Sequence, residues 1–238
     1  MTARTPRLYL LDVEGTVAPI SLVYEQMFPF ARAHFPVFLD ENKTDPAVGA
    51  DFDLLMAESH SEVDTTAPRI ADVEDISAAI AYLNWLMNRD RKSTALKGLQ
   101  GKVWKAGFES GELKGTLFDD VPDAMRRWAA LGQVAIYSSG SVEAQRLLFR
   151  YSIFGDLTPL IGGYFDTRTG PKAASSSYAA IAAAMEAEPD EVLFLSDVVR
   201  ELDAARDAGC QTRLVVREGN APVGDAHGHG VVESFALL

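Results

Sequence analysis

Two carboxylates stand directly behind a short apolar run near the start of the chain. Residues 8–11 read Leu-Tyr-Leu-Leu, and they are followed by Asp12-Val13-Glu14-Gly15-Thr16. The apolar run predicts a buried strand, and two acids that are two residues apart on an extended backbone point the same way. Such a pair can bind a hard cation, attack an electrophile or transfer a proton. Asp12 and Glu14 are therefore the first candidate site residues.

Later in the chain, polar side chains again follow short apolar runs. The apolar runs at residues 134–137 and 192–195 each predict another strand. A serine pair directly follows the first run, and an aspartate stands two residues after the second. A lysine lies between them in a Gly-Pro-Lys turn, and a glutamate follows the aspartate by four residues, about one helical turn. In chain order these candidates are Ser138, Ser139, Lys172, Asp197 and Glu201. Each residue type also occurs in ordinary turns and caps, so their shared order and placement at strand ends favour a common site.

These residue types fit phosphoryl transfer through an aspartyl-phosphate. Asp12 would attack phosphorus, and a divalent cation would be needed because a carboxylate and a phosphate repel each other. Magnesium prefers six oxygen ligands and usually keeps several waters. Asp12, Asp197 and Glu14, the last through its backbone carbonyl, would be the protein ligands of one Mg²⁺ per subunit.

The other candidates would handle charge and protons. Ser138 would donate a hydrogen bond to a phosphoryl oxygen, and Lys172 would neutralise the charge that builds up on Asp12 and the phosphate. Glu14 would protonate the leaving oxygen and then deprotonate the hydrolytic water.

The remaining two candidates have less direct roles. The backbone from Ser139 onward enters a predicted helix N-terminus, whose free N–H groups suit an anion. Glu201 would orient Asp197 or the water on the metal, and a solvated or ion-paired glutamate is an equally open interpretation.

Strands and helices alternate from residue 120 onward. The predicted strands cover residues 7–12, 134–137, 160–165, 192–195 and 212–216. This alternation predicts an α/β fold with a Rossmann-like, doubly wound parallel sheet, whose site lies at the carboxyl ends of the strands. Asp120, followed closely by a proline, is predicted to cap the first helix of this region.

The segment from residue 20 to residue 116 has a different character. It contains a polar, proline-bearing stretch near residues 40–68, and then apolar residues at three- and four-residue spacing from Ile70 to Met87. That spacing predicts an amphipathic helix. We interpret residues 20–116 as a mostly helical cap domain inserted after the first strand, and residues 1–19 and 117–238 as the catalytic core. Such a cap would exclude water and carry substrate specificity.

Composition limits the class of protein. The 238 residues carry a net charge of −12, which opposes nucleic-acid binding because that binding rests on Lys and Arg. Cys210 is the single cysteine, which excludes an internal disulfide and a cysteine-based zinc site. The short apolar run at the N-terminus predicts neither a signal peptide nor a membrane span. We expect a cytoplasmic monomer that binds no membrane. Near the C-terminus, we interpret the segment from His227 to Gly230 as a solvated turn.

The four motifs, taken in order, resemble those of the haloacid dehalogenase-like superfamily. Four segments of the chain are also similar to the enolase-phosphatases of methionine salvage: residues 90–97, residues 137–145, residues 164–167 and residues 193–197, together with the Leu-Gln-Gly sequence at 99–101 and Trp104. The resemblance covers nearly the whole chain. Glu14 departs from the aspartate that is usual at the second acidic position of superfamily phosphatases.

The resemblance implies a two-step, Mg²⁺-dependent reaction on a small phosphorylated diketone. The substrate, 2,3-diketo-5-methylthiopentyl-1-phosphate, would be enolised and then dephosphorylated to an acireductone, 1,2-dihydroxy-3-keto-5-methylthiopentene. By position, Asp12, Glu14 and Asp197 match the metal residues of the family. Ser138, Ser139 and Lys172 match its substrate-binding residues.

Three other functions remain open from the residues alone. A capped phosphatase or phosphomutase for another small phosphate ester would carry the same motifs. A halide-removing enzyme would use the same nucleophile, although it would need neither Glu14 nor Asp197. A phospho-accepting receiver domain would also use acids, a hydroxyl and a lysine on a parallel sheet. It is, however, about half as long, and its phosphorylated aspartate lies on a different strand from its acidic pair.

Overall fold

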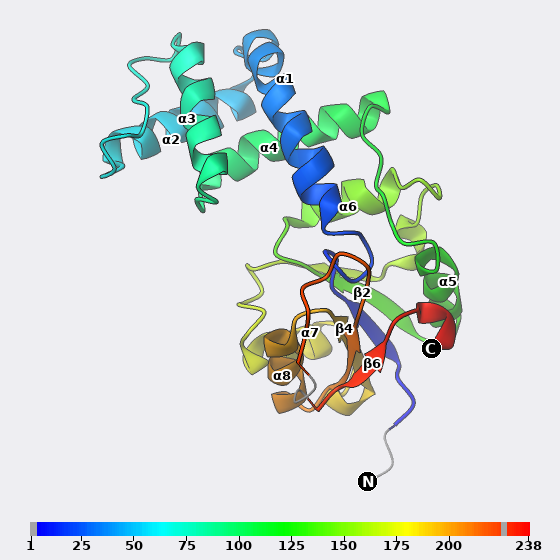
Figure 1. Cartoon of the computed structure of the whole chain (residues 1–238). Helices are drawn as coiled ribbons and strands as arrows, with labels where there is room; N and C mark the ends of the chain where they lie inside the picture. The colour runs from blue at the N-terminus through cyan, green and yellow to red at the C-terminus, as the bar shows by residue number, and fades with distance from the viewer. Residues whose placement is uncertain (1–3, 225–227) are drawn as a thin grey trace. The chain divides into compact units, whose positions relative to one another are not determined.

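The computed structural model describes residues 4–224 and 228–238, and it divides the chain into two units (Figure 1). The core unit joins the segment that ends at Val23 to the segment from Lys114 to the C-terminus, and the helical unit spans Tyr24–Leu113. These bounds lie a few residues from the division expected at residues 20 and 116. Each unit buries an apolar cluster of its own.

The core unit is built on one parallel sheet. Within the described residues it has six strands in the order β3-β2-β1-β4-β5-β6, and every neighbouring pair is parallel. The strands are β1 (Leu8–Leu11), β2 (Gln133–Tyr137), β3 (Gly163–Phe165), β4 (Val192–Ser196), β5 (Gln211–Val215) and β6 (Gly230–Val232). All four residues of β1 are buried, as expected for the central strand of a covered parallel sheet.

The strand order reverses at the centre of the sheet. From β1 the chain steps outward to β2 and β3, and it then returns to the other side of β1 to form β4, β5 and β6. In open α/β sheets, ligands bind beyond the carboxyl ends of the strands at such a reversal. Here the reversal lies between β1 and β4, which confirms the predicted doubly wound fold and locates its ligand-binding edge.

Helices cover both faces of the sheet. They are α5 (Val121–Leu131), α6 (Val142–Arg150), α7 (Ser175–Ala184) and α8 (Val199–Asp207). Leu8 and Leu10 pack in one buried cluster with residues of α7 and α8. Tyr9 points to the opposite face, where its ring stacks on Trp128 of α5 at 5.1 Å between centroids. The alternation along β1 therefore fixes which helices lie on which face.

Four longer helices make up the helical unit, after a π-helical turn at Leu22–Met27: α1 (Phe28–Glu41), α2 (Pro46–Ser61), α3 (Ile76–Asn88) and α4 (Thr94–Ser110). Asp45, Asp75 and Ser93 cap the last three by accepting hydrogen bonds from backbone N–H groups of the first turn. Because Asp75 sets the start of α3, the helix begins six residues later than the spacing from Ile70 predicts. No described helix is both long and apolar enough to cross a membrane.

Several sequence predictions for the core unit need correction. Asp120 precedes α5, but its side chain makes no capping bond, because its carboxylate instead binds Arg217 at 2.9 Å and the backbone N–H of Phe235 at 2.7 Å. Strand β6 was not predicted. Its neighbour His229 is buried and contacts Thr212 Oγ1 at 2.8 Å, so this residue is not in a solvated turn, while His227 lies outside the described residues.

Short 3₁₀ turns complete the core unit at Thr158–Leu160, Pro189–Glu191 and Phe235–Leu237.

Candidate active site

Strand β1 delivers Asp12 to the carboxyl edge of the sheet. The backbone N–H of Asp12 donates to the carbonyl of Leu195 at 3.0 Å, which continues the pairing of β1 with β4. Its side chain is buried. The chain then turns at Gly15, whose φ of +73° suits glycine and whose N–H donates to the carbonyl of Ala18 at 2.8 Å. The turn holds Asp12 at the point where the strand order reverses.

Lys172 bridges two carboxylates. Its Nζ lies 2.5 Å from Asp12 Oδ1 and 2.6 Å from Glu201 Oε2, and the three side chains are only 11%, 4% and 14% exposed respectively. Burial disfavours the ammonium form, but the two carboxylates outweigh it and raise the pKa of Lys172. Lys172 is therefore a fixed positive charge beside the predicted nucleophile.

Glu201 contacts Lys172 directly, and a buried serine links it to Asp12. Ser196 Oγ lies 3.4 Å from Asp12 Oδ2 and 3.2 Å from Glu201 Oε2. A hydroxyl has one proton, so it can donate to only one of these carboxylates at a time. The predicted action of Glu201 on Asp197 or on metal-bound water stays a prediction.

Ser138 and Glu14 meet at the same edge. Ser138 follows β2, is 1% exposed, and donates from Oγ to Glu14 Oε2 at 3.3 Å. Burial, followed by the charge of Asp12, raises the pKa of the Glu14 carboxyl. A carboxyl that holds its proton at higher pH is suited to donate it to a leaving group.

The loop after Ser138 is less open to an anion than its sequence predicts. Ser139 is exposed, but the N–H of Gly140 donates to Ser138 Oγ at 3.1 Å. The N–H of Val142, at the start of α6, donates to Asp166 Oδ2 at 3.3 Å. The N–H of Gly140, which the sequence predicts to face a phosphate, is therefore engaged within the protein, and so is the N–H of Val142.

Asp197 lies against the Gly15 turn together with an asparagine. A Cβ built on Gly15 would lie 2.4 Å from Asp197 Oδ2 and 3.0 Å from Asn220 Oδ1. Asn220 Nδ2 donates to the Gly15 carbonyl at 3.0 Å, while its buried Oδ1 has no hydrogen-bond donor in the described structure. Burial and the charge of Asp12 raise the pKa of Asp197 to about 7.

The oxygen atoms of this edge suit a magnesium ion. Asp12 and Asp197 are two carboxylates whose mutual repulsion a cation would relieve, and Asn220 adds an unpaired acceptor oxygen. Within the described residues, no group of three or more His, Cys, Asp and Glu side chains is arranged to hold a metal. Mg²⁺ does not need one, because it is commonly held by one or two carboxylates and takes other ligands from substrate phosphate and water.

Sequence reasoning missed three polar side chains that support the site. Gln145 of α6 donates from Nε2 to the carbonyls of Gly140 and Phe165, each at 2.9 Å, and so ties the Ser138 loop to the end of β3. The other two are Ser196 and Asn220. In the sequence, Ser196 stands next to a predicted metal ligand, and Asn220 follows a glycine just beyond the fifth strand.

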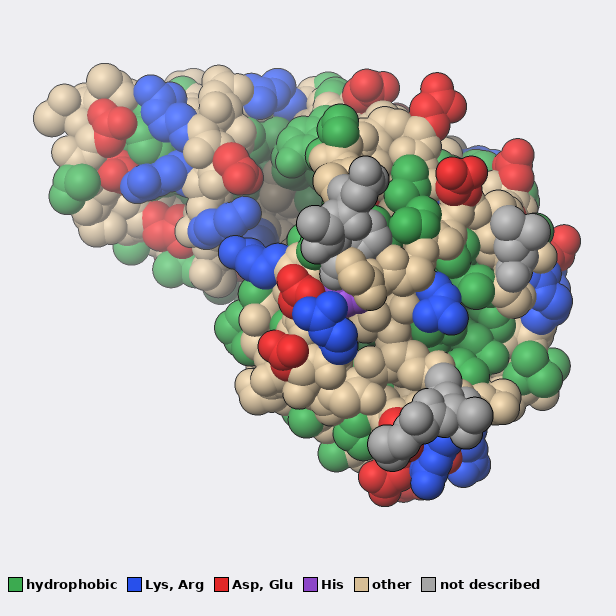
Figure 2. Space-filling model, turned by 60° about the horizontal axis from the view of Figure 1, so that its bottom comes forward, with side chains coloured by type: hydrophobic (Ala, Val, Ile, Leu, Met, Phe, Trp, Pro, Cys, Tyr) green, Lys and Arg blue, Asp and Glu red, His purple; other side chains and the backbone are tan. Residues whose placement is uncertain are grey.

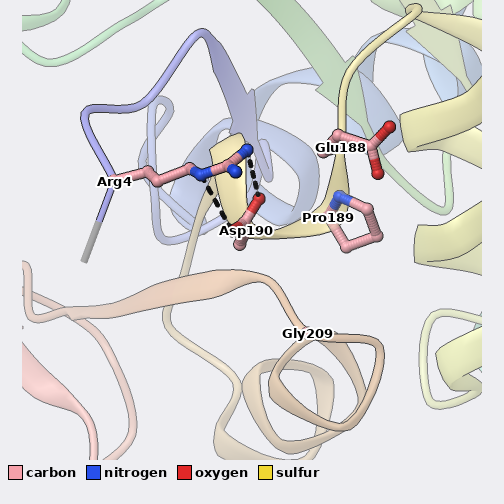
Figure 3. Close-up of a pocket in the computed structure, with 5 residues that line it drawn as sticks. All are labelled: Arg4, Glu188, Pro189, Asp190 and Gly209. Carbon is pink, nitrogen blue, oxygen red and sulfur yellow. Dashed lines mark hydrogen bonds and ion pairs between the residues drawn. The ribbon is translucent and has the colours of Figure 1, made fainter. Parts of the chain in front are cut away.

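A separate hollow of about 490 Å³ lies at the opposite end of the strands (Figure 3). Its lining residues are Arg4, Glu188, Pro189, Asp190 and Gly209. Arg4 and Asp190 form an ion pair across it at 3.3 Å. The hollow borders the start of β4, whereas Ser196 and Asp197 stand at the end of that strand, so it is distinct from the candidate site.

The chain is similar in sequence to known proteins over most of its length. The family model of haloacid dehalogenase-like hydrolases matches residues 6–209. The enolase-phosphatase E1 of Synechococcus elongatus is 54% identical over 215 residues, which are 90% of each chain. The enolase-phosphatase E1 of Pseudomonas aeruginosa is 46% identical over 233 residues, which are 98% of this chain and 97% of the relative.

Solved structures show the same architecture. The crystal structure of the UTR4 protein of Saccharomyces cerevisiae matches with a TM-score of 0.81 and 39% identity, and the match covers 98% of this chain and 100% of the other. A dehalogenase structure with 18% identity matches with a TM-score of 0.54 over 98% of this chain and 95% of the other, which shows a shared fold.

Proposed function

The chain belongs to the haloacid dehalogenase-like hydrolases and, within them, to the enolase-phosphatases, and from that premise we propose a function for its site. The protein enolises 2,3-diketo-5-methylthiopentyl-1-phosphate and then releases phosphate to leave 1,2-dihydroxy-3-keto-5-methylthiopentene, in methionine salvage. The resemblance noted in the sequence is thereby confirmed, as is the prediction that the chain is a hydrolase of a phosphate ester.

One observation carries the proposal. The ammonium of Lys172 lies within 2.6 Å of carboxylates that follow two different strands, Asp12 after β1 and Glu201 beyond β4. A carboxylate can approach a phosphate only if positive charge offsets the repulsion between them. Lys172 supplies such a charge at the atom that would attack.

In the phosphatase step, Asp12 attacks phosphorus and the bond to the substrate oxygen breaks. Ser138 donates a hydrogen bond to a phosphoryl oxygen, and Ser139 binds the phosphate at the exposed side of the loop. Glu14, whose pKa burial raises, gives its proton to the leaving oxygen. It then accepts a proton from the water that hydrolyses the aspartyl-phosphate, which regenerates Asp12.

In the enolase step, a proton leaves carbon and a negative charge develops on a carbonyl oxygen of the diketone. The ammonium of Lys172 stabilises that charge if the oxygen lies near it. Glu14 is our candidate to move the proton, since glutamate reaches one methylene further than aspartate. One carboxyl would then serve both steps in turn.

The proposal includes one Mg²⁺ per subunit, held by Asp12, the Glu14 carbonyl and Asp197. Bound there, Mg²⁺ would offset phosphate charge and polarise a substrate oxygen. The unpaired Asn220 Oδ1 and the raised pKa of Asp197 support a cation at this edge. Excess EDTA should stop turnover, and added Mg²⁺ should restore it.

Two further parts of the proposal concern the setting of the enzyme and the role of its helical unit. We propose a cytoplasmic monomer that binds neither nucleic acid nor membrane, and residues 24–113 as the unit that carries substrate specificity. The net charge of −12 opposes nucleic-acid binding, because that binding rests on Lys and Arg. On the face shown in Figure 2, Lys and Arg side chains lie in small separate groups rather than in one basic surface.

A single assay tests the function. The purified protein is mixed with the diketo-phosphate and Mg²⁺, and enol absorbance and free phosphate are followed in the same sample. We expect the enol to appear first and phosphate to follow. Phosphate release without an enol, or equal turnover of unrelated phosphate monoesters run in parallel, would show a different phosphatase.

A further inference from the structure

Three consecutive backbone carbonyls around Lys172 each accept a hydrogen bond from a buried hydroxyl. Tyr137 Oη donates to the carbonyl of Gly170 at 2.9 Å, Ser177 Oγ donates to that of Pro171 at 2.8 Å, and Tyr178 Oη donates to that of Lys172 at 2.7 Å. The three donor residues are at most 1% exposed. A turn with an otherwise irregular backbone is therefore bound at every residue of the Gly-Pro-Lys motif.

The donors come from two rigid elements. Tyr137 ends β2, and Ser177 and Tyr178 lie in the first turn of α7. The rings of Tyr137 and Tyr178 pack edge to face, with centroids 5.6 Å apart and an interplanar angle of 80°. Their two hydroxyls are thus fixed relative to each other as well as to the turn.

The turn fits closely against α7. Gly170 has a φ of +152°, and a Cβ built on it would lie 2.3 Å from Ser177 Oγ, so the Ser177 hydroxyl packs directly against this backbone. Pro171 has no N–H and a restricted φ, which further limits the conformations of the turn. Burial raises the pKa values of Tyr137 and Tyr178, so both phenols stay protonated and donate at physiological pH.

We propose that Tyr137, Ser177 and Tyr178 form a hydroxyl clamp that fixes the backbone of residues 170–172 and thereby places the Lys172 ammonium between Asp12 and Glu201. They are positioning residues, because their hydroxyls bind the backbone of the turn that carries Lys172. The lysine side chain has a flexible four-carbon stem and high rotamer entropy. Its 2.5 Å contact with Asp12 therefore depends on where its own backbone is held.

The clamp acts on the rate through Lys172 alone. Misplacing a group at a reacting centre by about 1 Å can cost on the order of 100-fold in rate. We therefore expect Tyr178→Phe, which frees the Lys172 carbonyl, to lower kcat about 10- to 100-fold while KM changes much less. Tyr137→Phe and Ser177→Ala free the neighbouring carbonyls and should have smaller effects of the same kind.

A double-mutant cycle tests the proposal. Phosphate release is measured for the wild type, Tyr178→Phe, Lys172→Ala and the double variant. If the phenol acts through the lysine, the double variant should be as slow as Lys172→Ala alone, within about twofold. Tyr9→Phe is the matched control, because Tyr9 is also a buried tyrosine of the core unit but contacts Trp128 and not the turn; its rate should equal that of the wild type.

Two outcomes would overturn the clamp. The first is that Tyr178→Phe slows the Lys172→Ala enzyme by the same factor as it slows the wild type, which would show an effect independent of Lys172. The second is an unchanged kcat in Tyr178→Phe. If that variant does not fold, Ser177→Ala and Tyr137→Phe are put through the same cycle with the same two criteria.

The turnover test of the clamp rests on the proposed function. A second measurement, which needs no turnover, is independent of that function. The affinity for inorganic phosphate in the presence of Mg²⁺ is measured by calorimetry for the same variants. A wild type that turns over no substrate would refute the proposed function. Phosphate affinities that fall in Tyr178→Phe, but not further in the double variant than in Lys172→Ala, would still support the clamp.

Discussion

Replacing Lys172 by Met would leave a group of buried acids without their cation. Methionine keeps most of the volume of the side chain and removes its charge. The ammonium lies 2.5 Å from Asp12 and 2.6 Å from Glu201. It also lowers the pKa values of Glu14 and Asp197. The variant therefore tests whether the site is balanced by this one lysine.

The expected loss follows from these distances. Opposite charges about 2.5 Å apart attract by about 6–7 kcal/mol at an effective dielectric constant of 20. Desolvation offsets part of this attraction, and removing one partner of a buried pair typically costs about 3–5 kcal/mol. For a protein of this size, that corresponds to a Tm lower by roughly 6–20 °C.

The loss should depend on pH with a definite sign. Without Lys172, the pKa values of Glu14, Asp197 and Glu201 rise further above their usual range, because the lysine lowers all three. Between the ordinary carboxyl pKa of about 4 and those raised values, the folded state binds more protons than the unfolded state. Stability of the variant should therefore fall as pH rises through that range. The wild type loses stability in the same way, but its carboxyl pKa values are raised less, so its loss ends at lower pH and the deficit of the variant is larger at pH 7.5 than at pH 5.

Thermal unfolding without metal, at both pH values, measures this effect. Lys102→Met is the control, since Lys102 pairs with the single, more exposed carboxylate of Asp51. It should cost on the order of 1 kcal/mol or less, as partly exposed pairs do. A Lys172→Met protein as stable as the wild type at pH 7.5, or a deficit that does not shrink at pH 5, would show that Lys172 does not balance these acids.

Three further predictions concern the nucleophile and the cation. Asp12→Asn should abolish phosphate release in the assay above, since an amide cannot form the aspartyl-phosphate, and substantial turnover would remove Asp12 from that role. Protons compete with Mg²⁺ for the Asp197 carboxylate, because burial and the charge of Asp12 raise its pKa to about 7. The Mg²⁺ affinity, measured by calorimetry, should therefore rise up to about tenfold per pH unit from pH 5.5 to 7 and then level off. An affinity that does not change with pH would contradict the assignment of Asp197 as a metal ligand. Gly15→Ala should lower the Mg²⁺ affinity at least about tenfold, because the new Cβ would lie 2.4 Å from Asp197 Oδ2. Gly111→Ala is the control, because Gly111 also has a positive φ, +82°, but has open space around it. That variant should lose only about 1–2 kcal/mol of stability and bind Mg²⁺ as the wild type does.

The sequence predicts the sheet and the meeting of its strand ends well. Runs of buried apolar residues mark β1, β2 and β4, and parallel strands must present their carboxyl ends at one edge. Once those ends are aligned, Asp12, Ser138 and Asp197 have to lie along that edge. The pattern of the strand residues is thus enough to predict that the acids and the hydroxyl lie close together, although the chemical roles of these side chains remain predictions.

Contacts between elements that are far apart in the chain could not be predicted in the same way. Asp120 has the type and position of a helix cap, yet it binds Arg217, which follows β5. That choice depends on how the C-terminal segment packs, which no local pattern contains. The hydroxyl clamp is similar, because a tyrosine at the end of a strand gives no sign that its hydroxyl will bind a carbonyl 33 residues later.

The split core has a consequence for synthesis on the ribosome. β1 emerges first, but its partners β2 and β4 begin only at Gln133 and Val192, after the whole helical unit has been translated. A nascent chain must therefore carry an unpaired, fully apolar strand while residues 24–113 already contain a complete apolar cluster of their own. We expect the inserted helices to fold first and the edge that carries Asp12 to form late, so chaperone dependence during translation should centre on the first strand.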